Sequence, residues 1–186
     1  MKKIYILLSR TGTLPSRFIH TFTRGDFTHT SLALTPQTDR FYSYARRTLR
    51  NLFNAGIIIE NIHDFVFARY PNCRCALFSL EVSDEAYEKM EGSVKELLEN
   101  YEKATYNFLG AIPMRMGIRI PRKYKLVCSQ FVARVLESSG EIELPKDPYL
   151  MLPNDFPKIK TIQKIYEGPI KHCRFAVTPP KKQTEN

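Results

Sequence analysis

The chain has 186 residues, of which 43% are hydrophobic and 25% are charged, as in an ordinary globular domain. This composition excludes a disordered, collagen-like or coiled-coil chain, and the longest apolar runs, such as Ile4–Leu8, are far short of the ~20 residues that cross a bilayer. We therefore expect one domain over residues 1–176, followed by a flexible polar tail at 177–186, with no transmembrane segment.

The charge is basic and unevenly distributed. The 28 Lys and Arg residues exceed the 19 Asp and Glu residues, giving a net charge of +9, although residues 84–103 are acidic. The excess gathers at 40–50 and 115–125, which predicts a soluble basic surface, with attraction of nucleic acid, anionic lipid or acidic wall polymers as the alternative. The sequence has no RNA- or DNA-binding motif, so no specific nucleic-acid partner is expected.

The N-terminus superficially resembles a signal peptide. Its apolar core is short, however, Arg10 interrupts it, and no small-residue cleavage site follows. We interpret residues 3–9 as a first strand instead. The four cysteines also lack the spacing of a secreted disulfide scaffold, so we expect reduced thiols in a cytoplasmic protein.

The N-terminal half is predicted to consist mainly of strands. Pro15 opens a short helix at 16–23. Four further strands follow, at 27–34, 41–45, 56–60 and 74–82. The first two of these four form a hairpin.

The C-terminal half is predicted to contain two helices. The first spans 84–103, with Ser83 as its N-cap and acids in its first turn. Its apolar stripe consists of Tyr87, Met90, Val94, Leu97, Leu98 and Tyr101. The second spans 128–138 and ends at a C-cap, Gly140. Its inward-facing side chains are Phe131, Val132, Val135 and Leu136. A basic loop at 110–125 and a proline-studded connection at 145–157 flank this helix.

Cys128 is the first candidate for chemistry, because it lies where a strand-like segment gives way to a helix. Unpaired N–H groups at a helix N-terminus stabilise a thiolate and can also hold an oxyanion. The alternative is a buried cysteine that packs as a small hydrophobe. His29 is the second candidate: it shares one face of its strand with Ser31 and could act as a general base, the alternative being an ordinary core or surface histidine.

Two segments, Gly25–Leu34 (GDFTHTSLAL) and Leu126–Leu136 (LVCSQFVARVL), together resemble the circularly permuted branch of the NlpC-type, papain-like cysteine hydrolases. In that branch the histidine strand precedes the cysteine helix, as it does here. Tyr106–Gly110 is similar to the family's tyrosine-rich segment before the cysteine, and Tyr166–Gly168 matches near the end; the resemblance covers roughly residues 3–173.

The resemblance implies an α+β, papain-like fold with a mostly antiparallel sheet packed against helices. It also implies that Cys128 is the nucleophile toward an amide or ester carbonyl and His29 the base, with no metal or organic cofactor. The implied substrates are peptides, often of the bacterial cell wall, for a peptidase or amidase, or acyl groups for a lipid acyltransferase or thioesterase, as in the lecithin:retinol acyltransferase relatives.

The family usually places a third polar residue, often Glu, Gln or His, on the strand after the histidine strand. Here that strand, 41–45, contains no acid or amide; Ser43 matches best, Tyr44 is an alternative, and a dyad is equally compatible. A serine cannot stabilise an imidazolium as a carboxylate does. This departure keeps open a rival interpretation, a ligand-binding module that has kept the fold and lost the chemistry.

Two further clusters are interpreted as structural. Cys73 and Cys75, with His172 and Cys173, have closer spacing than typical structural zinc sites, so we expect apolar filler or surface thiols rather than a metal site. The cations of the basic loop are Arg115, Arg119, Arg122, Lys123 and Lys125. We expect a solvated loop there, or alternatively the border of a cleft that favours an anionic substrate or lipid headgroup.

Overall fold

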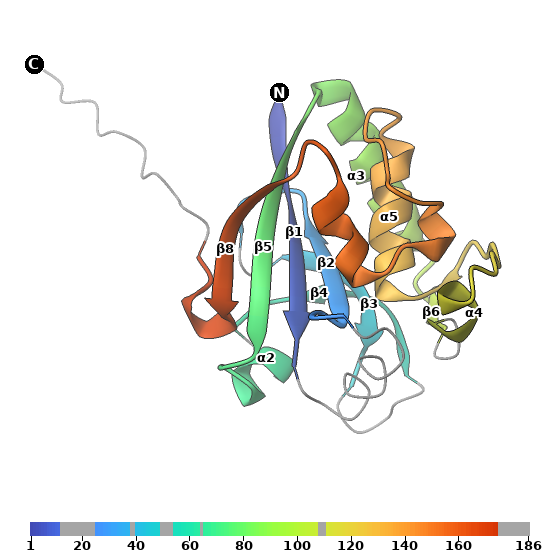
Figure 1. Ribbon diagram of the computed structural model, residues 1–186. Helices are drawn as coiled ribbons and strands as arrows, with labels where there is room; N and C mark the ends of the chain where they lie inside the picture. Colours follow the sequence, from blue (N-terminus) through green and yellow to red (C-terminus); the bar gives the residue numbers. More distant parts are fainter. Residues whose placement is uncertain (12–24, 38–39, 49–53, 64, 108–110, 175–186) are drawn as a thin grey trace, which may run out of the picture.

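The computed structural model describes residues 1–11, 25–37, 40–48, 54–63, 65–107 and 111–174. One eight-stranded sheet and several helices form a mixed α+β fold (Figure 1). The strands are β1 (Lys2–Arg10), β2 (His29–Ala33), β3 (Phe41–Arg46), β4 (Ala55–Glu60), β5 (Arg74–Val82), β6 (Thr105–Tyr106), β7 (Lys125–Leu126) and β8 (Gln163–Pro169). The helices are α2 (Phe65–Arg69), α3 (Asp84–Glu99), α4 (Ala111–Arg115) and α5 (Cys128–Ser138), with 3-10 turns η1 (Pro148–Leu150), η2 (Pro153–Lys158) and η3 (Ile170–His172).

The sheet has the strand order β7-β6-β4-β3-β2-β1-β5-β8. All neighbouring strands are antiparallel except β6 and β7. The prediction of a mostly antiparallel sheet packed against helices is therefore confirmed. No helix in the described part of the chain has the length and apolar character needed to cross a bilayer.

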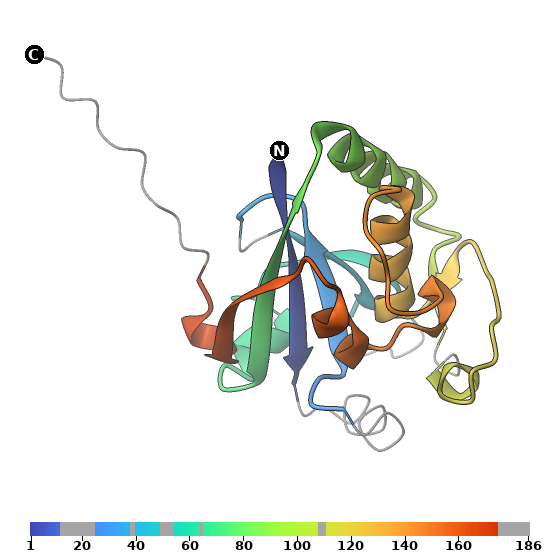
Figure 2. The same cartoon turned by 45° about the horizontal axis from the view of Figure 1, so that its top comes forward.

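Each face of the sheet carries a buried cluster, and side chains alternate between the two along the central strands. On β1, Ile4, Ile6 and Leu8 belong to the larger core, which α3 and α5 cover (Figures 1 and 2). Leu7 points the other way, into a smaller cluster that includes Phe67 of α2. α5 packs against β2 and β3, so the helix that begins at Cys128 lies over the strand that begins at His29.

α3 begins as predicted but ends early. The Ser83 hydroxyl accepts the Ala86 N–H at 3.1 Å, which caps the helix. At the other end, the Asn100 side chain donates to the Glu96 carbonyl at 2.9 Å and the helix stops at Glu99. The prediction that it reaches residue 103 is wrong. Tyr101 consequently leaves the apolar stripe and is 46% exposed.

α5 has the predicted limits, and its four predicted inward-facing residues are buried. Phe131 is fully buried, with its ring centroid 5.3 Å from that of Tyr44. Ser139, rather than Gly140, is the C-cap; Gly140 follows it with φ +71°, in the left-handed region that glycine adopts without strain.

Other predictions need correction. The strand predicted at 27–34 is only the five-residue β2, and the basic loop contains α4 and the start of β7. The helix α2 and the edge strand β8 were not predicted, because short or half-exposed elements leave little periodicity in a sequence. The predicted helix at 16–23 and the predicted tail at 177–186 lie outside the described residues.

Three cysteines are brought together on the face of the sheet opposite α5. Cys73, Cys75 and Cys173 are buried in the smaller cluster, and a hydrogen bond joins the Cys75 and Cys173 thiols. Burial raises the pKa of Cys73 to about 11. These thiols pack as apolar filler, which was one of the two predicted roles. Among the described residues, no group of three His, Cys, Asp or Glu side chains could hold a metal ion.

Candidate active site

The sheet register brings three polar side chains from three strands together. His29 begins β2, Ser43 lies in the middle of β3, and Glu60 ends β4. Because Phe41 pairs with Glu60 and Ser43 pairs with Ile58, alternation places Ser43 and Glu60 on the same face of the sheet. Ser31, two residues after His29 on β2, lies on this face as well, so hydroxyl, imidazole and carboxylate groups are within hydrogen-bond reach of one another.

The His29 ring is fixed through its Nε2 atom. This nitrogen lies 3.0 and 3.1 Å from the two Glu60 carboxylate oxygens and 3.1 Å from the Ser43 hydroxyl. The Ser31 hydroxyl donates to Glu60 Oε2 at 2.8 Å, which orients the carboxylate in turn. The side chains of His29 and Glu60 are only 19% and 11% exposed, so solvent screens this pair weakly.

Cys128 is the first residue of α5. Its thiol interacts with the His29 ring and with the backbone N–H groups of Thr30 and Ser129. Since Nε2 of His29 already has Glu60 and Ser43 as partners, we infer that the thiol faces the other ring nitrogen, Nδ1. The order of groups is therefore thiol, imidazole, carboxylate, which is the order of a catalytic triad.

The pKa values of the two central groups are shifted in opposite directions. Burial opposes a charge on His29, but the Glu60 carboxylate and the hydrogen bond to Cys128 outweigh it, and the pKa of His29 is raised well above its usual value. Burial likewise opposes a thiolate at Cys128, yet the hydrogen bond and charge of His29 and two backbone N–H groups lower the pKa of that thiol. Both shifts favour a thiolate–imidazolium pair.

Tyr106 adds a hydroxyl on the thiol side of the site. It lies on β6, within the tyrosine-rich segment that the sequence highlights. Burial, the nearby charge of Cys128 and a hydrogen bond to that residue raise the pKa of Tyr106 well above its usual value. The hydroxyl therefore stays protonated and can donate to a thiolate or an oxyanion.

The segment that contains η1 and η2 forms hydrogen bonds both to the helix that carries Cys128 and to the chain just before His29. The Gln130 side chain accepts the Val127 N–H at 3.1 Å and donates to the Tyr149 carbonyl at 3.0 Å, which fixes the start of α5. The Asn154 side chain accepts the Phe27 N–H at 3.1 Å and donates to the Phe27 carbonyl at 2.8 Å, two residues before His29. One stretch of chain thus holds the cysteine helix and the histidine strand.

The structure brings together the predicted residues Cys128, His29 and Ser43. It corrects the expectation that no acid faces His29, because Glu60 does so from the next strand along the sheet. The sequence signal was an acid at the end of the apolar run 56–59. The alternative third residue, Tyr44, lies on the opposite face of β3 from Ser43, against Phe131.

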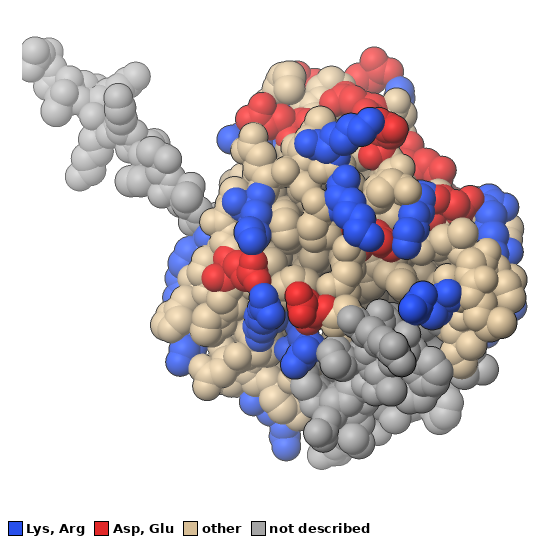
Figure 3. Space-filling model, viewed as in Figure 1, with Lys and Arg blue, Asp and Glu red and all other residues tan. Residues whose placement is uncertain are grey.

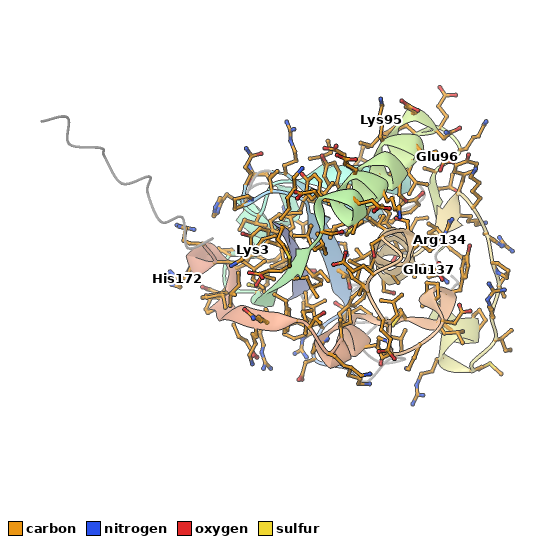
Figure 4. The ribbon with its side chains drawn as sticks, turned by 90° about the horizontal axis from the view of Figure 1, so that it is seen from above. Lys3, Lys95, Glu96, Arg134, Glu137 and His172 are labelled. Carbon is orange, nitrogen blue, oxygen red and sulfur yellow. The ribbon has the colours of Figure 1, made fainter. Side chains whose placement is uncertain are left out.

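The other histidines stay apart from this site. His63 and His172 are exposed, and Figure 4 shows His172 at the opposite side of the molecule from α5. His20 lies outside the described residues. The Tyr166–Gly168 segment is part of the edge strand β8 and does not reach Cys128 either, since β8 pairs only with β5 at the far edge of the sheet.

A cavity of about 510 Å³ opens beside Glu60. Its described lining combines apolar side chains with two arginines: Arg46, Arg47, Ile57, Ile58, Ile59, Glu60, Asn61, Phe67, Leu98 and Tyr101. Glu60 faces Nε2 of His29, on the side of the ring away from the thiol. The cavity therefore adjoins the carboxylate end of the array rather than the nucleophile.

No family model matches the chain, and no curated protein matches its sequence.

Proposed function

We propose that this protein is a cysteine hydrolase, a peptidase or amidase with a permuted NlpC-type, papain-like fold. One observation carries the proposal: Cys128, His29 and Glu60 form a buried array in which the pKa of the thiol is lowered and that of the imidazole is raised. Such opposed shifts suit a nucleophile and its base. The order of the two motifs in the sequence supports the same class.

In the proposed mechanism the Cys128 thiol gives its proton to Nδ1 of His29, and the thiolate attacks the acyl carbon. The carbonyl oxygen becomes an oxyanion, to which the Cys128 N–H and the Tyr106 hydroxyl donate. When the carbon–nitrogen bond breaks, His29 returns the proton to the leaving amine and a thioester remains. Water then gives a proton to His29, attacks the thioester and releases the acid, and the thiol recovers its proton.

Glu60 holds the imidazole with Nε2 toward the carboxylate and stabilises the imidazolium that forms in each half of the cycle. Ser43 and Ser31 position this pair through their hydroxyls. Amide, ester and thioester carbonyls all fit these steps, so acyl transfer to an acceptor other than water follows the same path up to the thioester. No step requires a metal or an organic cofactor.

The test is the rate at which iodoacetamide alkylates Cys128 as a function of pH, followed peptide by peptide with mass spectrometry. We expect alkylation well below pH 7, and we expect His29→Ala to remove this low-pH reactivity. Cys73 is the internal control, because its raised pKa predicts slow alkylation over the same range.

A Cys128 thiol that titrates near its free value of about 8.5 would remove the mechanism and favour the ligand-binding module instead. If the low-pH reactivity is found, incubation with muropeptides and with phospholipids follows, with Cys128→Ser as the inactive control. Release of an amine from the first or of a fatty acid from the second identifies the substrate class.

A further inference from the structure

The stretch from α4 to β7, residues 111–125 (hereafter the α4–β7 segment), exposes an unusual share of apolar side chains. Four of the nine large hydrophobic side chains that are exposed in the described part of the chain lie within residues 112–120. They are Ile112, Met116, Ile118 and Ile120, and Met116 is 70% exposed. Exposed apolar residues that cluster in this way mark an interaction surface.

The same stretch is free of negative charge. Residues 103–136 contain seven Lys and Arg side chains and no Asp or Glu. Two of these cations form ion pairs with acids: Arg119 pairs with Asp147 and Lys123 pairs with Glu96, each at 2.7 Å. Arg115, Arg122 and Lys125 form no ion pair with the residues that the structure describes. Figure 3 shows blue patches on a tan surface on the right, over α4.

The segment is held in shape rather than left loose. Gly117, with φ +73°, ends α4 in the left-handed conformation, and the Ile118 N–H bonds back to the Pro113 carbonyl at 2.9 Å. The Arg119 guanidinium lies 5.1 Å from the centre of the Tyr149 ring.

The C-terminal end of the α4–β7 segment is bound to α3 and α5. The Arg134 guanidinium donates to the Lys123 carbonyl at 3.1 Å, and the Lys123 ammonium pairs with Glu96. Glu96 of α3 and Arg134 of α5 lie on the same side of the molecule (Figure 4). The apolar side chains thus project from a fixed base.

We propose that the α4–β7 segment docks on a lipid bilayer with anionic headgroups. Aliphatic side chains enter the interface, and the unpaired cations contact the headgroup phosphates or carboxylates, the combination that interfacial segments use. The exposed side chains are aliphatic rather than aromatic, so they provide no stacking platform for nucleic-acid bases. Docking here presents the Cys128 end of α5 near the membrane, because β7 leads directly into that helix. The proposal does not depend on the chemistry of Cys128.

The first experiment measures co-sedimentation of the full chain with phosphatidylcholine vesicles that contain or lack phosphatidylserine. We expect binding only to the anionic vesicles. Each cation at such a surface contributes about 1 kcal/mol, or about fivefold in partitioning. Neutralising Arg115, Arg122 and Lys125 together to Gln therefore predicts a loss of roughly a hundredfold.

The matched control neutralises three exposed cations elsewhere, Arg40, Arg69 and Lys171, to Gln. It has the same net charge as the first triple variant, and we expect it to keep most of the binding. Equal losses in the two triple variants would show attraction to the overall charge and would overturn the proposal. Binding to single-stranded nucleic acid without binding to vesicles would do the same.

The second experiment reports insertion directly. The chain has no tryptophan, so Ile118→Trp introduces a single fluorophore, and Ile165→Trp on the edge strand β8 is the control at an exposed isoleucine. We expect a blue shift and quenching by brominated acyl chains for Ile118→Trp only. Identical spectra for the two variants on anionic vesicles would refute insertion. Cys128→Ser should bind vesicles like the wild type, which separates this proposal from the hydrolase.

Discussion

Replacing Glu60 with glutamine isolates what the carboxylate does for His29. Glutamine has nearly the same shape and keeps an oxygen that can accept from His29 Nε2 and from Ser31. The negative charge is removed, and one acceptor oxygen is replaced by an NH2 group. The measurement is made in a Cys128→Ser background, so that a thiolate does not contribute to the pKa of the imidazole.

The magnitude follows from the geometry. Unit charges 4 Å apart interact by about 4 kcal/mol at an effective dielectric constant of about 20, which is an upper limit here. Hydrogen bonds to charged groups contribute about 1.5–3 kcal/mol, against about 1 kcal/mol for neutral ones. The difference, about 0.5–2 kcal/mol, corresponds to roughly 0.4–1.5 pKa units. We therefore expect the pKa of His29 to fall by about one unit in Glu60→Gln.

The same shift changes stability with a definite sign. The folded pKa of His29 lies above the unfolded value of about 6.5. The stabilisation from the Glu60 pair is therefore complete below pH 6.5 and is lost as the pH rises through the folded pKa. Glu60→Gln should lower the free energy of unfolding most at acidic pH and least at alkaline pH.

The assay is an NMR titration of the imidazole C–H signals, with the His29 signal assigned by its loss in His29→Gln. Ser43→Ala is the matched control, because it removes the other partner of Nε2 without changing any charge. We expect that variant to shift the pKa of His29 by less than half as much. An unchanged pKa in Glu60→Gln, or an equal shift in Ser43→Ala, would refute the assignment of Glu60 as the partner that stabilises the imidazolium.

Two further predictions concern the scaffold. Asp155 is buried and accepts from two lysines and a backbone N–H; these outweigh burial and lower its pKa. We expect Asp155→Asn to lower the free energy of unfolding, measured with urea at pH 7, by about 2 kcal/mol. This loss should shrink as the pH falls through the lowered pKa of Asp155, and a loss that does not change with pH would contradict the prediction. Phe131→Ala should lower the free energy of unfolding by about 3–5 kcal/mol because the ring is fully buried. Ile165→Ala, at an exposed position, should lower it by under about 0.5 kcal/mol. Similar losses in the two variants would contradict the packing described.

Local chemistry in the sequence determined most of the elements and half of the candidate site. The compact apolar run of β1 and the apolar stripes of α3 and α5 are properties of neighbouring residues, so they can be recognised without a structure. The same holds for the position of Cys128, because a strand-like run followed by an apolar helical pattern defines a helix start. His29 and Ser43 followed from their place on strands.

Only the tertiary structure decided that Glu60 contacts His29 and that Tyr101 is exposed. Glu60 reaches His29 because β4 lies beside β3 and the register pairs Glu60 with Phe41, and no local sequence pattern encodes that register. Tyr101 fits the stripe of α3, but the helix ends before it, and the Arg47 guanidinium stacks 3.8 Å from its ring centre instead. Periodicity records which residues can be buried, whereas burial itself depends on contacts between elements that are distant in the chain.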